Sequence, residues 1–586
     1  MRSRYALGLL LLWAVVRSSP AAETLPAASQ WIPAEAVAEV EVSRPAALLD
    51  LVLNPELVKT IGGLPAYQKA IAEPKFQQFL GVVRYLEYQL HTDWAGGVRK
   101  LIGGGITAAV GPKGETILSI DAEDAAMLEK LHRTVIGFSA QKAPNEDATG
   151  GEGATEYRGV KLWSHGDGGA HALLGNRLLL VNRLDVLKTA LDLRAGEGRS
   201  LAAVAAYQAA RRAAGPAAVA TAYVDMAALK QNPKVREGLE HDNPLGALLL
   251  FGVTESLRDS QWLSLGLTVE KNVLRLHATV DGKTTARNGI ASFAWPQAAG
   301  EGALPNLRVP RCIAAGSLYR DLHAFYAAKD NLFPERTSGL IFFENMMGIF
   351  FTGRDLTEEV LSETRPEVRF VVAEQQYDPA IGTPQVQLPA MAVVFRLRHP
   401  EQSAEMTEEA WQKAIGLVNF TRGQKAEPGL ILDRDSYAGI RYTVGRFSAV
   451  GEKGKTGLPM RFNTQPSIAR LGDYLVLSST ERLTRDVLDT LKSEMAGPRQ
   501  PAAGVSSHVE LDGPQLSSIL EANYEVMVQR NMLEKGTTHE QAEAQIGLIS
   551  LAPRYLGRAM LSLTCEDSRP AATLELQLNP SGRAAQ

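Results

Sequence analysis

The sequence predicts an α+β protein of two homologous halves, each a largely antiparallel sheet with helices packed mainly on one face. The first observation is a unit of turn, short apolar strand and helix that occurs at 171–193 and again at 468–491. The second is that other segments recur around this unit in the same order. The third is that tight turns separate alternating apolar runs, which is typical of antiparallel hairpins.

The recurring segments can be followed along the chain from the start of each half. The opening "WIPAEAVAEVEVSRPAALLDL" matches "RVPRCIAAGSLYRDLHAFYAA" with Pro33 aligned to Pro310, a shift of 277 residues. Next come a strand followed by an acidic helix, then "EYRGVKLW" paired with "SYAGIRYT", where Tyr157 aligns with Tyr437. Six such blocks in one order indicate an internal duplication rather than chance.

Within each repeated unit the local chemistry agrees with the predicted elements. Glycine followed by Asn or Asp opens the strands "NRLLLVN" and "DYLVLSS", because glycine accepts a positive φ and the polar side chain satisfies nearby backbone groups. The following helices place Val186, Ala190 and Leu191 on one face, and Leu483, Val487 and Leu488 on the equivalent face. Each strand is therefore expected to feed a helix that packs back on the sheet.

Two aspartates at equivalent places could be mistaken for a catalytic pair. Asp225 in "YVDMAAL" and Asp512 in "ELDGPQL" each end a predicted strand and precede a helix. An aspartate in that position accepts hydrogen bonds from the first free amides of the helix. We therefore interpret both as helix caps.

The amino terminus has the form of a secretory signal peptide. Arg2 and Arg4 precede the apolar run "YALGLLLLWAVV", which ends in the small-residue stretch "SSPAA". The apolar run is shorter than the roughly 20 residues that a membrane-spanning helix needs. We expect cleavage after Ala21 and a mature protein in the periplasm or secreted from the cell, with no transmembrane anchor.

The predicted organisation follows from the duplication and the signal. Residues 1–21 are the signal peptide, 22–294 the first α+β half, 295–307 a linker containing Pro and Gly, and 308–586 the second half. A body with two halves has a surface between them, and such surfaces are common binding places.

Composition narrows the function classes. The 586 residues carry a formal charge of −4 from 61 basic and 65 acidic residues, which disfavours nucleic acid as a partner. The chain has only two cysteines, Cys312 and Cys565, which is too few for a disulfide framework. The sequence leaves open whether these are two buried thiols or a single bridge.

The sequence motifs of common enzymes and metal sites are missing. The loop 449–466 contains "GEKGKT", but Ala449 occupies the place of the first Walker A glycine, and Pro459 and a strand follow where a helix is required. His165 and His171 are close in sequence and are interpreted as a surface turn rather than a metal site. We therefore assign no catalytic, cofactor-binding or metal-binding residue and expect no cofactor.

Two apolar stretches, 76–90 and 340–351, occupy matching places in the halves. Helices that cover a sheet have this composition. Exposed Met and Phe side chains also make adaptable binding surfaces, so the stretches are candidate partner surfaces too.

The chain resembles a family of exported bacterial proteins with a domain of unknown function, known mainly from cell-envelope and secreted sequences. The resemblance rests on "WIPAEAVAEVEVSRPAALL", the meander "YRGVKLW…LLGNRLLLVNRLDVLKTALDL" and "ATAYVDMAALKQ". It covers most of 31–290 and, more weakly, 305–580. It implies the architecture, but no catalytic residue, cofactor or substrate.

These observations predict an exported, non-catalytic cell-envelope protein that binds another protein or a surface polymer. The alternative is an exported hydrolase whose active site lies between the halves and carries no sequence motif. A hydrolase requires a nucleophile and a base, or clustered carboxylates, within hydrogen-bond reach. A binding protein requires only an accessible face. The sequence does not indicate the oligomeric state.

Overall fold

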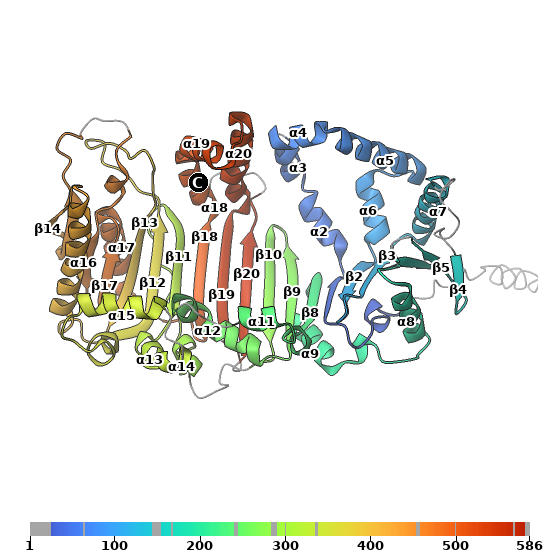
Figure 1. Ribbon diagram of the computed structural model, residues 1–586, viewed down its shortest axis with the longest axis horizontal. Coiled ribbons are helices and arrows are strands. Elements are labelled where there is room, and N and C mark those ends of the chain that lie inside the picture. Colours follow the sequence, from blue (N-terminus) through green and yellow to red (C-terminus); the bar gives the residue numbers. More distant parts are fainter. Residues whose placement is uncertain are drawn as a thin grey trace, which may run out of the picture. The chain divides into compact units, whose positions relative to one another are not determined.

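The computed structural model in Figure 1 divides the chain into two compact units. Unit 1 comprises Met1–Ala46 and Gly81–Gln208, and unit 2 comprises Ala47–Leu80 and Ala209–Gln586. The structure describes residues 25–62, 65–142, 154–165, 168–239, 244–282, 290–298, 300–333, 338–452, 457–497, 500–566 and 569–579. The predicted signal peptide, residues 1–21, lies outside the described residues.

Unit 1 is built on an antiparallel sheet. Its strands, in spatial order, are β1 (Ala38–Val42), β2 (Gly105–Val110), β3 (Thr116–Asp121), β7 (Arg177–Val181), β6 (Ala170–Leu174), β5 (Val160–Ser164) and β4 (Ala154–Tyr157). Helix α8 (Leu184–Arg194) buries Val186, Ala190 and Leu191, as the helical periodicity predicted. The chain enters α8 directly from β7, so the strand and its helix form one local unit.

Unit 2 is built on a longer antiparallel sheet. Its strands in spatial order are β8 (Ala220–Asp225), β9 (Trp262–Glu270), β10 (Val273–Val280), β20 (Arg569–Gln577), β19 (Arg558–Glu566), β18 (Val505–Asp512), β11 (Cys312–Tyr319), β12 (Thr364–Ala373), β13 (Ala390–Leu397), β17 (Tyr474–Ser478), β16 (Ser467–Leu471), β15 (Ile440–Phe447) and β14 (Leu430–Tyr437). Every one of these pairings is antiparallel, which confirms the predicted α+β class with largely antiparallel sheets.

Helices alternate with strands along the chain in both units. The remaining helices are α2 (Pro45–Val52), α3 (Pro55–Gly62), α4 (Pro65–Ala72), α5 (Pro74–Leu90), α6 (Trp94–Ile102), α7 (Ala125–Lys142), α9 (Ala205–Ala214), α10 (Met226–Leu229), α11 (Pro233–Gly238), α12 (Pro244–Asp259), α13 (Leu322–Ala327), α14 (Lys329–Leu332), α15 (Ser338–Phe350), α16 (Ala404–Gln424), α17 (Glu481–Met495), α18 (Gly513–Ala522), α19 (Tyr524–Lys535) and α20 (His539–Leu556). Short 3-10 or π turns occur at Ala28–Gln30, Leu201–Ala203, Ile290–Ala294, Leu356–Val360, Leu361–Glu363 and Met460–Asn463.

The main core of unit 2 lies between α17 and the strands beside it, which Figure 1 shows together. Leu483, Val487 and Leu488 of α17 are buried, as predicted, against the buried strand residues Val394 and Val476. Burial of a leucine or valine side chain contributes about 1.5 to 3 kcal/mol each, so this packing is a main source of stability for unit 2.

The pairing order of the strands recurs along the chain. The order β1, β2, β3, β7, β6, β5, β4 has the same form as β11, β12, β13, β17, β16, β15, β14. The consecutively paired strands β8, β9 and β10 likewise correspond to β18, β19 and β20, and helices separate the first strand from the second in both sets.

One side-chain contact also recurs. Tyr157 donates a hydrogen bond of 2.8 Å to Asp192, and Tyr437 donates one of 2.8 Å to Asp489. Both tyrosines precede a left-handed turn, with φ of 52° and 75° at Arg158 and Gly159 and 49° and 80° at Ala438 and Gly439. These parallels support the predicted duplication, which stays a prediction.

The compact units differ from the predicted halves 22–294 and 308–586. Residues 209–294 belong to unit 2 because β10 pairs with β20 and continues the sheet of the second half. The stretch predicted as a linker, 295–307, is packed rather than exposed: Trp295, Ala303 and Leu307 are buried. Long-range strand pairing therefore brings the end of the first half into the second unit.

The structure confirms that the two equivalent aspartates cap helices. Asp225 accepts a hydrogen bond of 2.9 Å from the backbone N–H of Ala228, and Asp512 accepts one of 2.9 Å from Gln515. Asp321 caps α13 in the same way. A catalytic pairing of Asp225 with Asp512 has no support in this geometry.

Removing the Asp512 cap should lower the free energy of unfolding of unit 2 by about 1 kcal/mol. The Asp512→Ala variant leaves an amide of α18 without its acceptor, whereas Asp512→Asn retains a capping oxygen. Urea unfolding of both variants would measure the difference. Equal losses in Ala and Asn would contradict the capping role.

Candidate functional site

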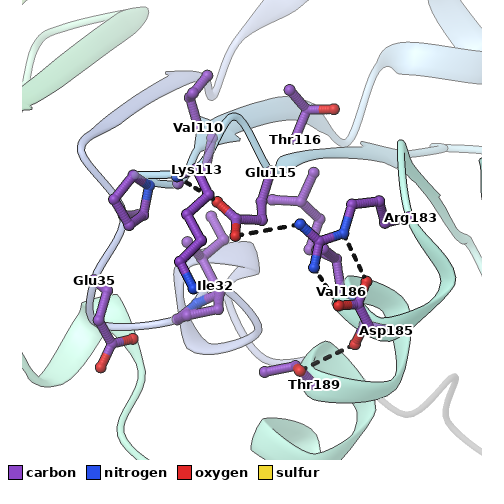
Figure 2. A pocket seen from close by; sticks show the side chains of 16 residues that line it. Ile32, Glu35, Val110, Lys113, Glu115, Thr116, Arg183, Asp185, Val186 and Thr189 are labelled. Atoms are coloured by element: carbon purple, nitrogen blue, oxygen red, sulfur yellow. Dashed lines mark hydrogen bonds and ion pairs between the residues drawn. The ribbon is translucent and has the colours of Figure 1, made fainter.

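A cavity of about 360 Å³ in unit 1 is the candidate functional site (Figure 2). It lies between the turn that joins β2 to β3, the beginning of α8 and the segment 32–36. The lining residues are Ile32, Pro33, Glu35, Ala36, Ala109, Val110, Gly111, Pro112, Lys113, Glu115, Thr116, Ile117, Arg183, Asp185, Val186 and Thr189.

The floor of the cavity is apolar. Ile32, Ala36, Ala109, Ile117 and Val186 are all buried. In β2 and β3 this follows from strand alternation, since Ala109 and Ile117 point inward while Val110 and Thr116 are exposed. The floor can therefore receive an apolar group.

The rim carries a fixed group of charges. Arg183 bonds Asp185, with Nε 3.0 Å from Oδ1, and its Nη1 lies 3.6 Å from Oε1 of Glu115 (Figure 2). Hydrogen bonds from the backbone N–H groups of Glu115 and Lys113 lower the pKa of the Glu115 carboxyl. The hydrogen bond from Arg183 lowers the pKa of Asp185. Both carboxylates are therefore held in their ionised form.

Asn182 fixes the turn that forms one wall. Its side-chain oxygen accepts a hydrogen bond of 2.9 Å from the N–H of Thr116, and its amide donates one of 2.8 Å to the carbonyl of Gly114. Gly114 has a φ of 78°, a conformation that glycine adopts without strain. The wall and the rim are thus positioned before any ligand binds.

The lining of the cavity holds few side chains that could act as a nucleophile. Its lining contains no Ser, His or Cys, and its hydroxyl groups belong to Thr116 and Thr189. The Thr189 hydroxyl donates to the backbone carbonyl of Asp185 at 3.0 Å rather than to a side-chain base. Nucleophilic catalysis requires a nucleophile hydrogen-bonded to a base, so the lining does not provide it.

A second hollow, of about 750 Å³, also lies in unit 1. Its deepest cation, Arg177, bonds both oxygens of Asp121 at 2.6 and 2.7 Å and donates to the Pro26 carbonyl at 2.7 Å. Arg177 is buried and its guanidinium lies 4.9 Å from the centre of the Trp31 ring. These contacts of Arg177 hold distant parts of the chain together, so this hollow is a weaker candidate for ligand binding.

The two histidines singled out in the sequence do come together, but with a third that the sequence did not indicate. His171 Nδ1 lies 2.9 Å from His165 Nε2, and His171 Nε2 lies 2.9 Å from His132 Nε2. The ring nitrogens of His171 are therefore occupied by other rings rather than converging on a common point. Within the described part of the chain, no set of three or more His, Cys, Asp or Glu side chains is placed to hold a metal ion.

The structure corrects the expectation that both apolar stretches cover a sheet. Stretch 76–90 forms most of α5, which has no buried residue among those whose exposure is described. Stretch 340–351 falls in α15 and just beyond it, where Leu340 is the buried residue and Phe342 is 67% exposed. Helix α5 therefore contributes no core residue, and α15 contributes Leu340, which packs in a buried cluster with Tyr326 and Phe333.

The other features singled out in the sequence are the loop 449–466 and the two cysteines. Most of "GEKGKT" in the loop 449–466 lies outside the described residues. Cys312 carries a free thiol, so it is not bridged to Cys565. Burial raises the pKa of the Cys312 thiol to about 11, which keeps it protonated and unreactive at neutral pH.

Comparison with known proteins identifies no family for this chain. No family model matches it, and no curated protein matches it. Similar solved structures include crystal form I of TP0453, with 8% identity over 46% of this chain and 84% of that chain and a TM-score of 0.22. Crystal form III of TP0453 is 9% identical over 45% and 83%, with a TM-score of 0.24. Likeness at this level carries no argument about function.

Among the helices that the structure describes, none has both the length and the hydropathy of a membrane span.

Proposed function

We propose that this chain is an exported, non-catalytic cell-envelope protein that binds a protein or surface polymer through the unit 1 cavity. In this proposal the signal peptide 1–21 is removed, the mature chain is periplasmic or secreted, and its architecture arose by duplication. The observation that carries the proposal is the cavity's combination of an apolar floor with a rim whose carboxylates are already ion-paired. The resemblance to exported envelope proteins supports the location.

The cavity favours a protein partner over a polymer of sugars. Its floor would accept one apolar side chain, because Ile32, Ile117 and Val186 offer no hydrogen bonds there. Glu35 and Lys113 place one charge of each sign at the mouth, where Figure 2 shows them beside the cavity. A peptide segment with an apolar residue between charged neighbours complements both features.

A hydrolase remains the alternative class, but the cavity does not favour it. Glu115 and Asp185 are ion-paired with one arginine, and neither carboxyl has a raised pKa of the kind that a general acid needs.

Blocking the mouth of the cavity should reduce partner binding by about tenfold or more. The Thr189→Trp variant places a large side chain at the rim, while Lys188→Trp places the same group on the neighbouring, exposed position of α8. Mature protein, residues 22–586, would be immobilised and exposed to envelope extract, and retained proteins quantified by mass spectrometry.

The two variants distinguish the outcomes. A saturable partner held by the wild type and Lys188→Trp but lost from Thr189→Trp supports the cavity as the site. Equal retention by both variants would mean that the partner binds elsewhere on the chain. A folded wild type that retains nothing contradicts the binding function, and a screen of ester, peptide and glycoside substrates would then test the hydrolase class.

A further inference from the structure

The middle of the unit 2 sheet presents a face made of leucines. Strand register sets Leu267 opposite Leu276, Leu276 opposite Leu574, and Leu574 opposite Leu561. Directly opposed residues in antiparallel strands project from the same face, and so do residues two apart along a strand. In the three rows nearest the turn between β9 and β10, the leucines that share this face are Leu265, Leu267, Leu274, Leu276, Leu561, Leu563, Leu574 and Leu576.

The other face of the same strands is polar. His277 lies opposite Thr573, and their side chains are 3.1 Å apart. His508 lies opposite Ser562, with Nδ1 2.8 Å from the hydroxyl oxygen. These residues alternate with the leucines, so this part of the sheet is amphipathic.

The leucine face is not covered as a core face would be. None of these eight leucines is fully buried: Leu561 is 41% exposed, and the others are half-buried. Leu563, at one end of the face, packs against the buried cluster of Phe293 and Trp295. Figure 1 shows β9, β10, β20 and β19 with helices at the ends of the strands rather than across their middle. An apolar sheet face left accessible to water is typical of an interaction site.

The size of the face decides against a second copy of the chain. Four strands spaced by about 4.8 Å, with three rows of residues about 6.7 Å apart, give a face of about 400 Å². A stable protein interface buries about 800 Å² on each partner. On this face, the four strands also carry none of the Trp, Tyr or Arg side chains that dominate protein interfaces.

The chemistry of the face matches a hydrocarbon chain, which needs apolar contact and no directional bonds. Each buried methylene of such a chain contributes about 0.8 kcal/mol. Lys271 lies in the turn between β9 and β10, at one end of the leucine rows, and is exposed. Its ammonium group complements a carboxylate at the end of the chain.

We propose that the leucine face of β9, β10, β20 and β19 binds a long-chain fatty acid, with the fatty-acid carboxylate directed toward Lys271. The site lies in unit 2 and is independent of the function proposed for the unit 1 cavity. It requires no covalent step.

Titration of the mature chain with the fluorescent probe dansyl-undecanoic acid, followed by displacement with palmitate, tests this proposal. Leu561→Glu places a charge on the leucine face, and Ser562→Glu places the same charge on the opposite face one residue later. We expect Leu561→Glu to weaken palmitate binding by about tenfold or more and Ser562→Glu by less than about twofold. Lys271→Glu should weaken palmitate but not palmityl alcohol.

Several results would overturn the proposal. One is a folded wild type, judged by circular dichroism, that does not bind the probe. Another is an equal effect of Leu561→Glu and Ser562→Glu. Dimerisation in sedimentation experiments that Leu561→Glu abolishes would assign the face to a second copy. Binding to phosphatidylglycerol vesicles without displacement of the probe by palmitate would assign it to a membrane surface.

Discussion

Acidification from neutral pH to about pH 4 is expected to lower the free energy of unfolding of unit 1 by about 3 kcal/mol through His171. Burial, together with the neighbouring His132 and His165, lowers the pKa of His171 from 6.5 to about 4. The folded protein therefore holds a neutral ring that the unfolded chain would protonate. Stability is fully present above pH 6.5 and is lost as the pH falls toward 4.

The arrangement of the rings explains why a proton is excluded. His171 is buried, stacks on Trp163 with the ring planes 8° apart, and contacts a histidine nitrogen at each of its own nitrogens. Each of the two nitrogen–nitrogen contacts needs one proton to form a hydrogen bond. Three neutral rings can supply both protons, with the donors pointing either way along the row. A second proton on His171 would also find an acceptor nitrogen on each neutral neighbour, so burial and the nearby His132 and His165, rather than a missing hydrogen bond, lower its pKa.

Charges beside the row act on its outer member. Glu129 favours the protonated form of His132, whereas Lys161 disfavours it, and burial lowers the pKa of His132 overall. The pH dependence should therefore be set mainly by His171, with a smaller contribution of the same sign from His132.

Urea unfolding followed by tryptophan fluorescence across this pH range would measure the effect. In His171→Phe the stacking ring is kept but the titrating group is lost, so the difference in stability between neutral and acid pH should shrink by about 3 kcal/mol. His539→Gln alters an exposed histidine and should leave the profile unchanged. Parallel profiles for wild type and His171→Phe would contradict the assignment.

Local elements could be predicted because their signals are contained within short stretches. In 468–491 the glycine turn, the apolar run and the helical periodicity each specify one element, and the structure has β16, β17 and α17 there. The aspartate caps follow from the same local chemistry. The pairing of β10 with β20 joins residues about 300 positions apart, as in Arg275 with Glu575, and no local signal specifies it.

The candidate sites depend on such distant contacts. Glu115 and Arg183 meet because β3 pairs with β7, and neither stands in a recognisable motif. His132 is 39 residues from His171, and no motif in the sequence of α7 links the two histidines. The leucine face also requires register, since alternation within each strand predicts an apolar side but not which strands share it.

Replacing Arg320 should destabilise unit 2 by about 3 to 5 kcal/mol, because it removes a buried guanidinium that hydrogen-bonds to oxygens on several elements. Arg320 is 3% exposed and follows β11. Its guanidinium donates to the Leu248 and Leu249 carbonyls of α12 at 2.8 and 2.9 Å. It also donates to the hydroxyls of Ser506 and Ser507 on β18, both at 2.9 Å.

Burial disfavours the charged form of this side chain. Burial lowers the pKa of Arg320 to about 10, so the side chain is still charged at neutral pH. Within the described residues its hydrogen-bond partners are carbonyl and hydroxyl oxygens rather than a carboxylate. A buried ion pair can be replaced by apolar residues on both sides, but backbone carbonyls cannot be replaced. The arginine therefore joins α12, β11 and β18 in a way that a hydrophobic side chain cannot reproduce.

Urea unfolding of Arg320→Met and Arg320→Lys would measure the effect, with Arg434→Met on the exposed strand β14 as the matched control. Lysine keeps the charge but cannot reach oxygens on three elements at once, so its loss should be about half that of methionine. The control should change stability by less than about 0.5 kcal/mol. If Arg320→Met were as stable as the wild type, the carbonyls would have found other donors, and the packing of α12 on the sheet rather than its link to Arg320 would hold this part of unit 2 together.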